Sequence, residues 1–393
     1  MDTFTKTTST SWFQRLGQSL AGILIGIVLV LGSIVLLFWN EGRTVKTARA
    51  LEEGAGIVQT IDPKGDLVAA NGKLVHFSGT FEPGGIASDD EFPGISAPEG
   101  AAALIRSVEM YQWRENQKSE TRTKLGGGEE TVTTYTYEKV WSDDAIDSSR
   151  FEKPESHANP PMPYESRTFE VTGGTVGSIE LGPDAFGGLG SSKALPPTAD
   201  MLSTIQAVTG SGQRVVLENG KVSIRRGDTD EIGALRIGYS VRTISDISAV
   251  GRLEGGRLTA YTASNGNEIL LAEDGTASAQ QMFDTAISGN AVIAWVLRLV
   301  GFIAMLIGFN LVFSVIGVAG DIIPLVGSLL RFATGIVAFA LAAFGSLLVI
   351  GIAWFWYRPV LSLALIGGGV VIALVAMRFA KSRATSKAAA VAA

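Results

Sequence analysis

Long uncharged, apolar stretches occur near both ends of the chain. Residues 16–40 contain no charged side chain, and between Arg298 and Arg378 the only charged residues are Asp321, Arg331 and Arg358. A bilayer core of about 30 Å requires roughly 20 apolar residues of helix, because lipid offers no hydrogen-bond partner to an open backbone. The pattern therefore predicts four transmembrane helices, one N-terminal and three C-terminal, at residues 16–40, 291–320, 332–357 and 359–377.

The long segment between the first two predicted helices has a different pattern, in which alternating and β-branched residues are interrupted by Gly, Pro and Asn. This alternation predicts strands at residues 74–81, 103–114, 131–141, 214–224 and 235–247. Gly255-Gly256 predicts a hairpin turn, because such turns favour positive φ. The predicted fold class is therefore an integral membrane α+β protein, with a large β-rich domain (residues 65–290) inserted between helices 1 and 2.

Four shorter segments complete the predicted organisation. Residues 1–15 are rich in Thr and Ser, which predicts a disordered tail, and residues 378–393 form a basic tail. Residues 41–64 begin as an amphipathic juxtamembrane helix, for which a plain solvated helix is the alternative interpretation. Residues 321–331 enclose an apolar piece too short to span a bilayer, which predicts a re-entrant or interfacial segment.

The predicted number of crossings determines which segments share a side of the membrane. Four crossings place both tails on one side and the inserted domain on the other, and the positive-inside rule assigns the basic tail to the cytoplasm. The domain is then extracytoplasmic. A cleaved signal peptide is a poorer interpretation of residues 16–40, because the apolar run exceeds the roughly 7–15 residues of a signal core and no small-x-small cleavage site follows.

Composition narrows the possible chemistry. The 393-residue chain is 46% hydrophobic, contains no cysteine and only two histidines, and has a net charge of -6. These values exclude disulfides, thiol catalysis and cysteine zinc sites, and they provide no basic surface for nucleic acid. No hydrolase, metalloprotease or nucleotide-binding motif is present. We therefore expect a protein that is not an enzyme, with no catalytic residue, cofactor, metal or nucleic-acid partner.

Aromatic and basic residues flank the predicted helices, as is typical of side chains that hold a protein at the membrane surface or bind lipid headgroups. The predicted interface residues are Trp12, Arg15, Trp39, Arg43, Lys46, Trp354, Trp356, Tyr357 and Arg358. Gly22 and Gly26 form a small-xxx-small pattern that favours close helix packing.

Asp321 and Arg331 flank the short apolar piece, and they have two possible interpretations. They mark helix ends at headgroup level, or they form an intramembrane polar pair that gates a path with Asn310.

Several short motifs, in order along the chain, resemble the LUMA proteins, the transmembrane protein 43 family. The motif residues are Asn40, Glu41, Gly42, Arg43, Tyr111, Gln112, Trp113, Arg225, Arg226, Gly227 and Asp228, with further matches at 233–237 and 354–359. The resemblance implies an integral membrane protein that organises membrane protein complexes or lipid-rich regions and has no settled enzymatic activity. Its large domain would face the lumen of the endoplasmic reticulum or nuclear envelope in eukaryotes, and the periplasm in bacteria. The Ala- and Gly-rich, Cys-free composition suggests a bacterial member in the inner membrane.

The predicted function is a non-enzymatic membrane scaffold. Its expected partners are membrane lipids, other membrane or envelope proteins, and a second copy of the chain through small-residue helix faces. The alternative is a channel or transporter subunit with a polar path near Asn310, Asp321 and Arg331.

Overall fold

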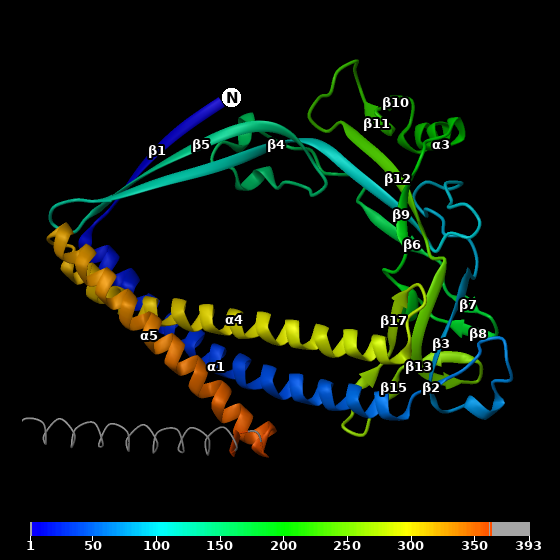
Figure 1. The fold of residues 1–393 in the computed structure, drawn as a ribbon. Helices are drawn as coiled ribbons and strands as arrows, with labels where there is room; N and C mark the ends of the chain where they lie inside the picture. The colour runs from blue at the N-terminus through cyan, green and yellow to red at the C-terminus, as the bar shows by residue number, and fades with distance from the viewer. Residues whose placement is uncertain (1, 361, 364–393) are drawn as a thin grey trace, which may run out of the picture. The chain divides into compact units, whose positions relative to one another are not determined.

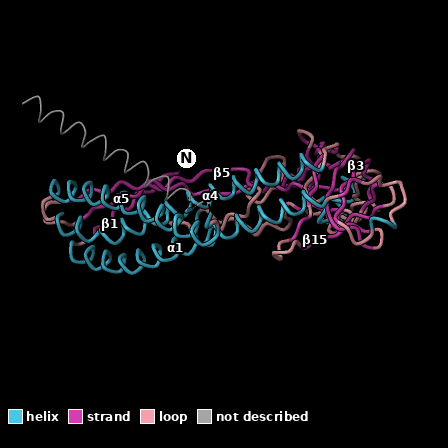
Figure 2. Tube along the Cα trace, turned by 60° about the horizontal axis from the view of Figure 1, so that its bottom comes forward, coloured by secondary structure: helices cyan, strands magenta, loops and turns pink. Residues whose placement is uncertain are grey.

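The computed structural model describes residues 2–360, 362 and 363, and the chain divides into two compact units. The β unit consists of Met1–Thr8, Ala50–Arg122 and Thr131–Ala286. The helical unit consists of Ser9–Arg49, Thr123–Glu130 and the described residues from Ile287 onward. Figure 1 shows the element order, and Figure 2 separates helices from strands by colour.

Three long apolar helices dominate the helical unit. They are α1 (Trp12–Ile57), α4 (Ala279–Gly320) and α5 (Pro324–Tyr357). In the described part of the chain, these three are the helices long and apolar enough to cross a membrane. One N-terminal and two C-terminal predicted spans are thus present as helices, whereas the fourth predicted span, residues 359–377, lies almost entirely outside the described residues.

Two segments predicted separately from the membrane spans lie mostly within the long helices. The predicted juxtamembrane helix at residues 41–64 is largely the continuation of α1, which runs without a break to Ile57. The predicted interfacial segment at residues 321–331 is a three-residue turn followed by the first two turns of α5, which begins at Pro324. At Glu41 the reason is that a charged residue changes the environment that a helix prefers without breaking its backbone hydrogen bonds. Proline at the first helical position costs no hydrogen bond.

Close backbone contact joins α1 to α4. A Cβ atom at Gly26 would lie 2.5 Å from the carbonyl oxygen of Gly308, and one at Gly308 would lie 2.8 Å from the carbonyl oxygen of Gly26. The small-residue face of α1 is therefore used for packing within the chain, side by side with α4 (Figure 1). Leu37, Met305, Ala342 and Val349 form the buried apolar cluster of this bundle.

The larger sheet of the β unit has eight strands. Its main path is β1-β5-β4-β12-β11-β10, with β6 paired to β4 and β9 paired to β12. The strand bounds are β1 (Asp2–Thr10), β4 (Ala103–Thr123), β5 (Glu129–Ser142), β6 (Arg167–Glu170), β9 (Ser191–Leu195), β10 (Arg214–Glu218), β11 (Lys221–Arg225) and β12 (Leu235–Thr243). The predicted 103–114/131–141 hairpin is confirmed and extends to its Gly-rich tip. Residues 214–224, predicted as one strand, are instead a hairpin that turns at Asn219-Gly220, where both residues have positive φ.

The second sheet has seven strands in the order β17-β13-β14-β8-β7-β3-β2. β13 also pairs with β3, so the pairings from β13 through β14, β8, β7 and β3 close into a ring. The strand bounds are β2 (Gln59–Thr60), β3 (Leu74–Pro83), β7 (Gly174–Val176), β8 (Ile179–Leu181), β13 (Asp246–Glu254), β14 (Arg257–Thr259) and β17 (Leu271–Asp274). The predicted Gly255-Gly256 turn is confirmed, with φ of 61° and 88°. A small separate hairpin, β15 (Tyr261–Thr262) and β16 (Glu268–Ile269), and two short helices, α2 (Pro183–Phe186) and α3 (Ala199–Thr209), complete the unit.

The N-terminal segment is not a disordered tail. Residues 2–10 form strand β1, which pairs with β5. Phe4 stacks on Tyr135 with ring centroids 6.3 Å apart, and Lys6 Nζ lies 2.8 Å from a carboxylate oxygen of Glu152. The threonines that suggested a disordered tail are β-branched and suit a strand once a partner strand is available.

A buried ion pair lies within the core of the β unit. Arg106, 1% exposed, donates to both carboxylate oxygens of Asp89 at 2.7 and 2.8 Å, and the Tyr239 hydroxyl donates to Asp89 Oδ2 at 2.8 Å. Burial opposes the charge on Arg106, but the adjacent Asp89 outweighs it and raises the pKa of the guanidinium. Burial and the bond to Asp89 also raise the pKa of Tyr239. This pair attaches the loop that contains Asp89 to β4 and β12.

Candidate functional site

A buried carboxylate connects the three helices of the helical unit. Glu41 on α1 is fully buried and accepts hydrogen bonds from Arg298 of α4, at 2.6 Å from Nε and 2.8 Å from Nη2. The indole Nε1 of Trp354 on α5 donates to the same carboxylate at 2.8 Å. We call Glu41, Arg298 and Trp354 the Glu41 cluster. It ties α1, α4 and α5 together through one side chain.

The rest of the Asn40–Arg43 motif packs around the Glu41 cluster. Asn40 Nδ2 donates to the carbonyl oxygen of Ala294 at 3.1 Å, and Arg43 Nη1 donates to Asn290 Oδ1 at 3.1 Å. Gly42 is buried, and a Cβ there would lie 2.6 Å from the ring of Tyr357. The motif residues therefore have specific packing roles between helices, which explains why these residue types occur together at the end of an apolar run.

A second buried carboxylate lies near the turn between α4 and α5. Asp321 is fully buried, and its Oδ2 is 2.5 Å from Nη2 of Arg15 and 2.5 Å from Nη1 of Arg331. Arg15 also lies 2.7 Å from Oε1 of Glu129 and donates to the carbonyl oxygen of Gly127 at 2.5 Å. We call Asp321, Arg15, Arg331 and Glu129 the Asp321 cluster. The predicted Asp321–Arg331 pair is present, and Arg15, predicted only as an interface residue, is its third member.

The tip of the β4–β5 hairpin is part of this cluster. Gly127 has a φ of 80°, and a Cβ there would lie 2.3 Å from the indole Cδ1 of Trp12. The indole Nε1 of Trp12 donates to the carbonyl oxygen of Val318 at 2.8 Å, and Gly126 N donates to the carbonyl oxygen of Ile322 at 3.1 Å. Only glycine permits this close approach of the tip backbone to α1.

The tip residues belong to the helical unit, although the sequence predicted residues 65–290 as one domain. Residues 123–130 contact both Arg15 and the Ile322 turn, so the hairpin tip lies at the same end of the helices as these residues.

The two clusters are separated by about the thickness of a bilayer. Glu41 follows Arg15 by 26 positions in one continuous helix, which at 1.5 Å per residue is about 39 Å. A hydrocarbon core is about 30 Å thick. Each cluster therefore fits the headgroup level at one end of an apolar segment, where charged side chains are tolerated.

Asn310 forms no hydrogen bond or ion pair with Asp321 or Arg331 in the described part of the bundle. Asn310 is exposed and donates to the carbonyl oxygen of Leu306 on its own helix at 2.8 Å. The buried residues there are apolar or small, including Leu37, Met305, Ala338 and Ala342. Asn310 therefore does not join Asp321 and Arg331 in a continuous polar route.

The predicted interface anchors divide into inward- and outward-facing side chains. Trp39 and Trp356 are 54% and 73% exposed, as expected for side chains facing lipid. Tyr357 instead packs near Phe38, with ring centroids 5.5 Å apart, and Trp354 belongs to the Glu41 cluster. The remaining anchors, Lys46 and Arg358, are exposed and half-buried, respectively.

The motif around Tyr111 is structural. Gln112 is fully buried and holds the loop after β5, since its Nε2 donates to the carbonyl oxygen of Asp144 and its Oε1 accepts from Ile146 N, both at 2.9 Å. Tyr111 packs on Trp141 at 5.2 Å, and Trp113 N donates to Asn159 Oδ1 at 2.7 Å.

The Arg225–Asp228 motif follows strand β11 and borders a cavity of about 220 Å³. Arg225 pairs with Glu218 and Asp230, at 3.2 and 3.4 Å from Nη1, and Asp228 pairs with Arg214. Arg226 is exposed, and Gly227 forms the corner between these side chains. The sequence predicted a loop corner with paired arginines here. The pairing is confirmed for Arg225, but Arg226 forms no pair in the described part of the chain.

The contacts that sequence reasoning missed are long-range. Arg298 and Trp354 lie 257 and 313 positions from Glu41, and Arg15 lies 306 positions from Asp321. One signal was available, because Glu41 and Arg298 are opposite charges at the ends of two apolar runs and would lie at equal depth in a bilayer. Among the described residues no group of three or more potential metal ligands occurs.

Comparison with known proteins gives consistent matches along the chain. The family model described as Transmembrane protein 43 matches residues 110–359. Transmembrane protein 43 of Homo sapiens is 29% identical, covering 97% of this chain and 95% of that protein, and that of Pongo abelii is 30% identical, covering 96% and 93%. The Transmembrane protein 43 homolog of Drosophila melanogaster is 28% identical over 88% of this chain and 91% of that protein. No solved structure matches.

Proposed function

The chain belongs to the transmembrane protein 43 family, and on that basis we propose that it is a non-enzymatic membrane scaffold. One observation supports the proposal above others: two buried carboxylates of the bundle, Glu41 and Asp321, pair with arginines at its two ends. Such pairs hold helices in a defined arrangement.

Exposed apolar faces provide the contact with lipid. Leu24, Val28, Val35 and Leu347 are each at least 68% exposed on the helices. In water such a surface would aggregate, whereas in a bilayer it is solvated by acyl chains. The β unit contributes long polar loops, which are the usual place for contacts with other proteins. We propose that it binds other membrane or envelope proteins, in the bacterial inner membrane if the chain is bacterial.

Two results from native membranes test the scaffold role. Full-length tagged chain, purified after gentle solubilisation at native expression level, is expected to co-purify with a defined membrane protein in a fixed ratio. Liposomes containing the purified chain are expected to show no ion or solute flux above empty liposomes. Purification of the chain alone would contradict the scaffold role, and a flux that Asp321→Ala abolishes would favour the channel alternative.

Self-association remains part of the proposal, but it needs a different helix face. Gly26 already contacts Gly308 within the chain, so the small-residue face predicted for self-association is occupied. Chemical crosslinking in native membranes is expected to give dimers or larger species. Monomer alone at every protein level would remove self-association.

A further inference from the structure

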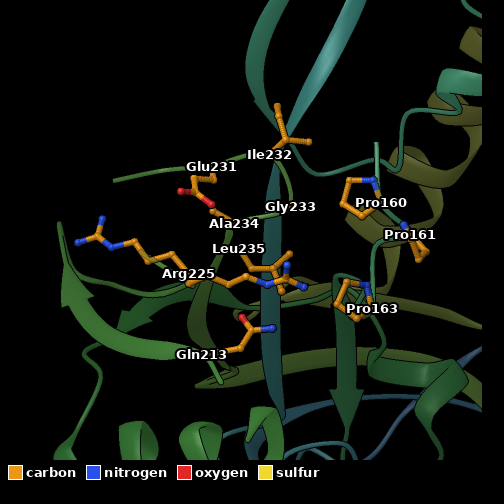
Figure 3. A pocket seen from close by; sticks show the side chains of 11 residues that line it. Pro160, Pro161, Pro163, Gln213, Arg225, Glu231, Ile232, Gly233, Ala234 and Leu235 are labelled. Carbon is orange, nitrogen blue, oxygen red and sulfur yellow. The ribbon is translucent and has the colours of Figure 1, made fainter. Parts of the chain in front are cut away.

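A partly enclosed cavity of the β unit lies between the end of β11, the start of β12 and a proline-rich loop. Its volume is about 220 Å³. Pro160, Pro161 and Pro163 line one side, and Arg225 and Glu231 lie on the other (Figure 3). Drug-sized ligands occupy sites of about 300–1,000 Å³. The cavity therefore suits a ligand smaller than these.

Arg225 lines the cavity with unused hydrogen-bond donors. Its side chain is 14% exposed, and both of its carboxylate partners, Glu218 and Asp230, contact Nη1 at the long distances of 3.2 and 3.4 Å. Nε is buried without a partner. Nε and Nη2 form the side-on edge of a guanidinium that binds a carboxylate through two parallel hydrogen bonds. Here neither atom of that edge has a partner among the described residues.

Arg226 adds an unpaired positive charge to the same cavity. It lines the cavity, is exposed, and forms no ion pair or hydrogen bond with any residue that the structure describes. Arg214 and Arg236, the neighbouring arginines, are both paired, with Asp228 and Asp230. Arg226 thus supplies an unpaired cation at the cavity wall, where an anionic ligand would pair with it.

Two other features narrow the ligand class. Glu231 also lines the cavity and has no cationic partner in the described part of the chain, so a second negative charge on a ligand would be repelled. The prolines, Ile232 and Leu235 give the cavity an apolar wall. We propose that the cavity binds a small monoanionic carboxylate with an apolar body, its carboxylate on Arg225 and Arg226 and its apolar part against the prolines. The chain terminus of a partner protein and a free carboxylic acid share this chemistry.

Benzoate is a suitable probe, because it combines one carboxylate with a compact apolar ring. Ligand-observed NMR titration of the full chain in nanodiscs measures its binding. We expect saturable binding of benzoate. Arg226→Gln is expected to weaken the benzoate affinity at least tenfold, because it removes one charged hydrogen-bonding partner of the carboxylate. Arg122→Gln is the matched control, since Arg122 is exposed on β4, away from the cavity, and the change in net charge is identical. Glu231→Gln is expected to strengthen binding about twofold to fivefold.

Three results of this titration would contradict the proposal. Absence of saturable binding, or equal weakening by Arg226→Gln and Arg122→Gln, would show that benzoate associates only with the nanodisc or with general charge. Tighter binding of phenyl phosphate, which is largely doubly charged at pH 7, would overturn the assignment to monoanionic carboxylates. A peptide ending in a free carboxylate, compared with its amidated form, separates a protein terminus from a free acid as the source. The carboxylate site does not depend on the scaffold role, because the helical unit can hold a complex together with the cavity empty.

Discussion

Glu41 provides the sharpest test of how the helical unit is held together. Replacing it by alanine removes the acceptor for three donors, at 2.6, 2.8 and 2.8 Å, from two other helices. Arg298 is only 15% exposed, so its charge would be left partly buried without a counterion. Removing one member of a buried ion pair costs about 3–5 kcal/mol. We expect the free energy of unfolding to fall by about that amount.

The assay is unfolding in mixed micelles with increasing SDS, followed by tryptophan fluorescence. Trp354, one of seven tryptophans in the chain, donates to Glu41 and contributes to this signal. Glu52→Ala is the matched control, because Glu52 is an exposed glutamate on the same helix. Exposed substitutions usually change stability by no more than about 0.5 kcal/mol.

A double substitution separates the ion pair from simple packing. Glu41→Leu with Arg298→Met removes both charges together, and such apolar replacements of buried pairs are neutral or stabilising by about 1–4 kcal/mol. We expect the double variant to recover most of the stability lost in Glu41→Ala. The reasoning is refuted if Glu41→Ala is no worse than Glu52→Ala, or if the double variant is as unstable as the sum of its two single variants.

Three further predictions concern the hairpin tip and the β unit. Gly127→Ala is expected to release the hairpin tip and expose it to limited proteolysis, because a Cβ at Gly127 would collide with Trp12. Gly126→Ala is the control, since a Cβ at Gly126 meets no neighbouring atom. Equal cleavage of the two variants would argue against the contact between Gly127 and Trp12. Arg106→Met is expected to destabilise the β unit by about 3–5 kcal/mol, because it leaves the buried carboxylate of Asp89 without its partner. Arg167→Met, which breaks an exposed ion pair, is expected to cost less than about 1 kcal/mol. Equal losses of stability in thermal unfolding would contradict the importance of burial. The raised pKa of Tyr239 means that the folded phenol stays neutral while the unfolded one ionises near pH 10. Its stabilising contribution is therefore present below pH 10 and lost above it, by up to about 1.4 kcal/mol per pH unit. Tyr239→Phe should flatten that alkaline loss, and an unchanged slope would contradict it.

The absence of native cysteine gives a direct test of sidedness. Leu125→Cys at the hairpin tip and Phe13→Cys on α1 each introduce a single thiol at a side chain that is at least 78% exposed. A membrane-impermeant maleimide is expected to label both from the same side of sealed vesicles, because the tip contacts the N-terminal end of α1. Labelling from opposite sides would show that the tip contact is absent in the membrane.

Local patterns were sufficient for the three long helices and for several strands of the β unit. The apolar runs predicted α1, α4 and α5, and the alternation and Gly-Gly turn predicted the hairpins of the β unit, because both depend on residues close together in sequence. The strand formed by residues 2–10 was missed for the opposite reason. A threonine-rich segment has no strong preference alone, and its strand exists through pairing with β5.

The Asp321–Arg331 pair was predicted from sequence, whereas the other ion pairs of the two clusters depend on tertiary structure. Glu41 looked like a charge that ended a membrane segment, and Arg15 like a surface anchor. Arg298 lies 257 positions from Glu41 and Asp321 lies 306 positions from Arg15, and no local periodicity identifies such a pairing. Burial then decides their importance, since a carboxylate in water is solvated, whereas one enclosed among helices must be paired. Residue types and spacing thus established helices, strands and membrane class, and only the folded chain determined which charges became structural.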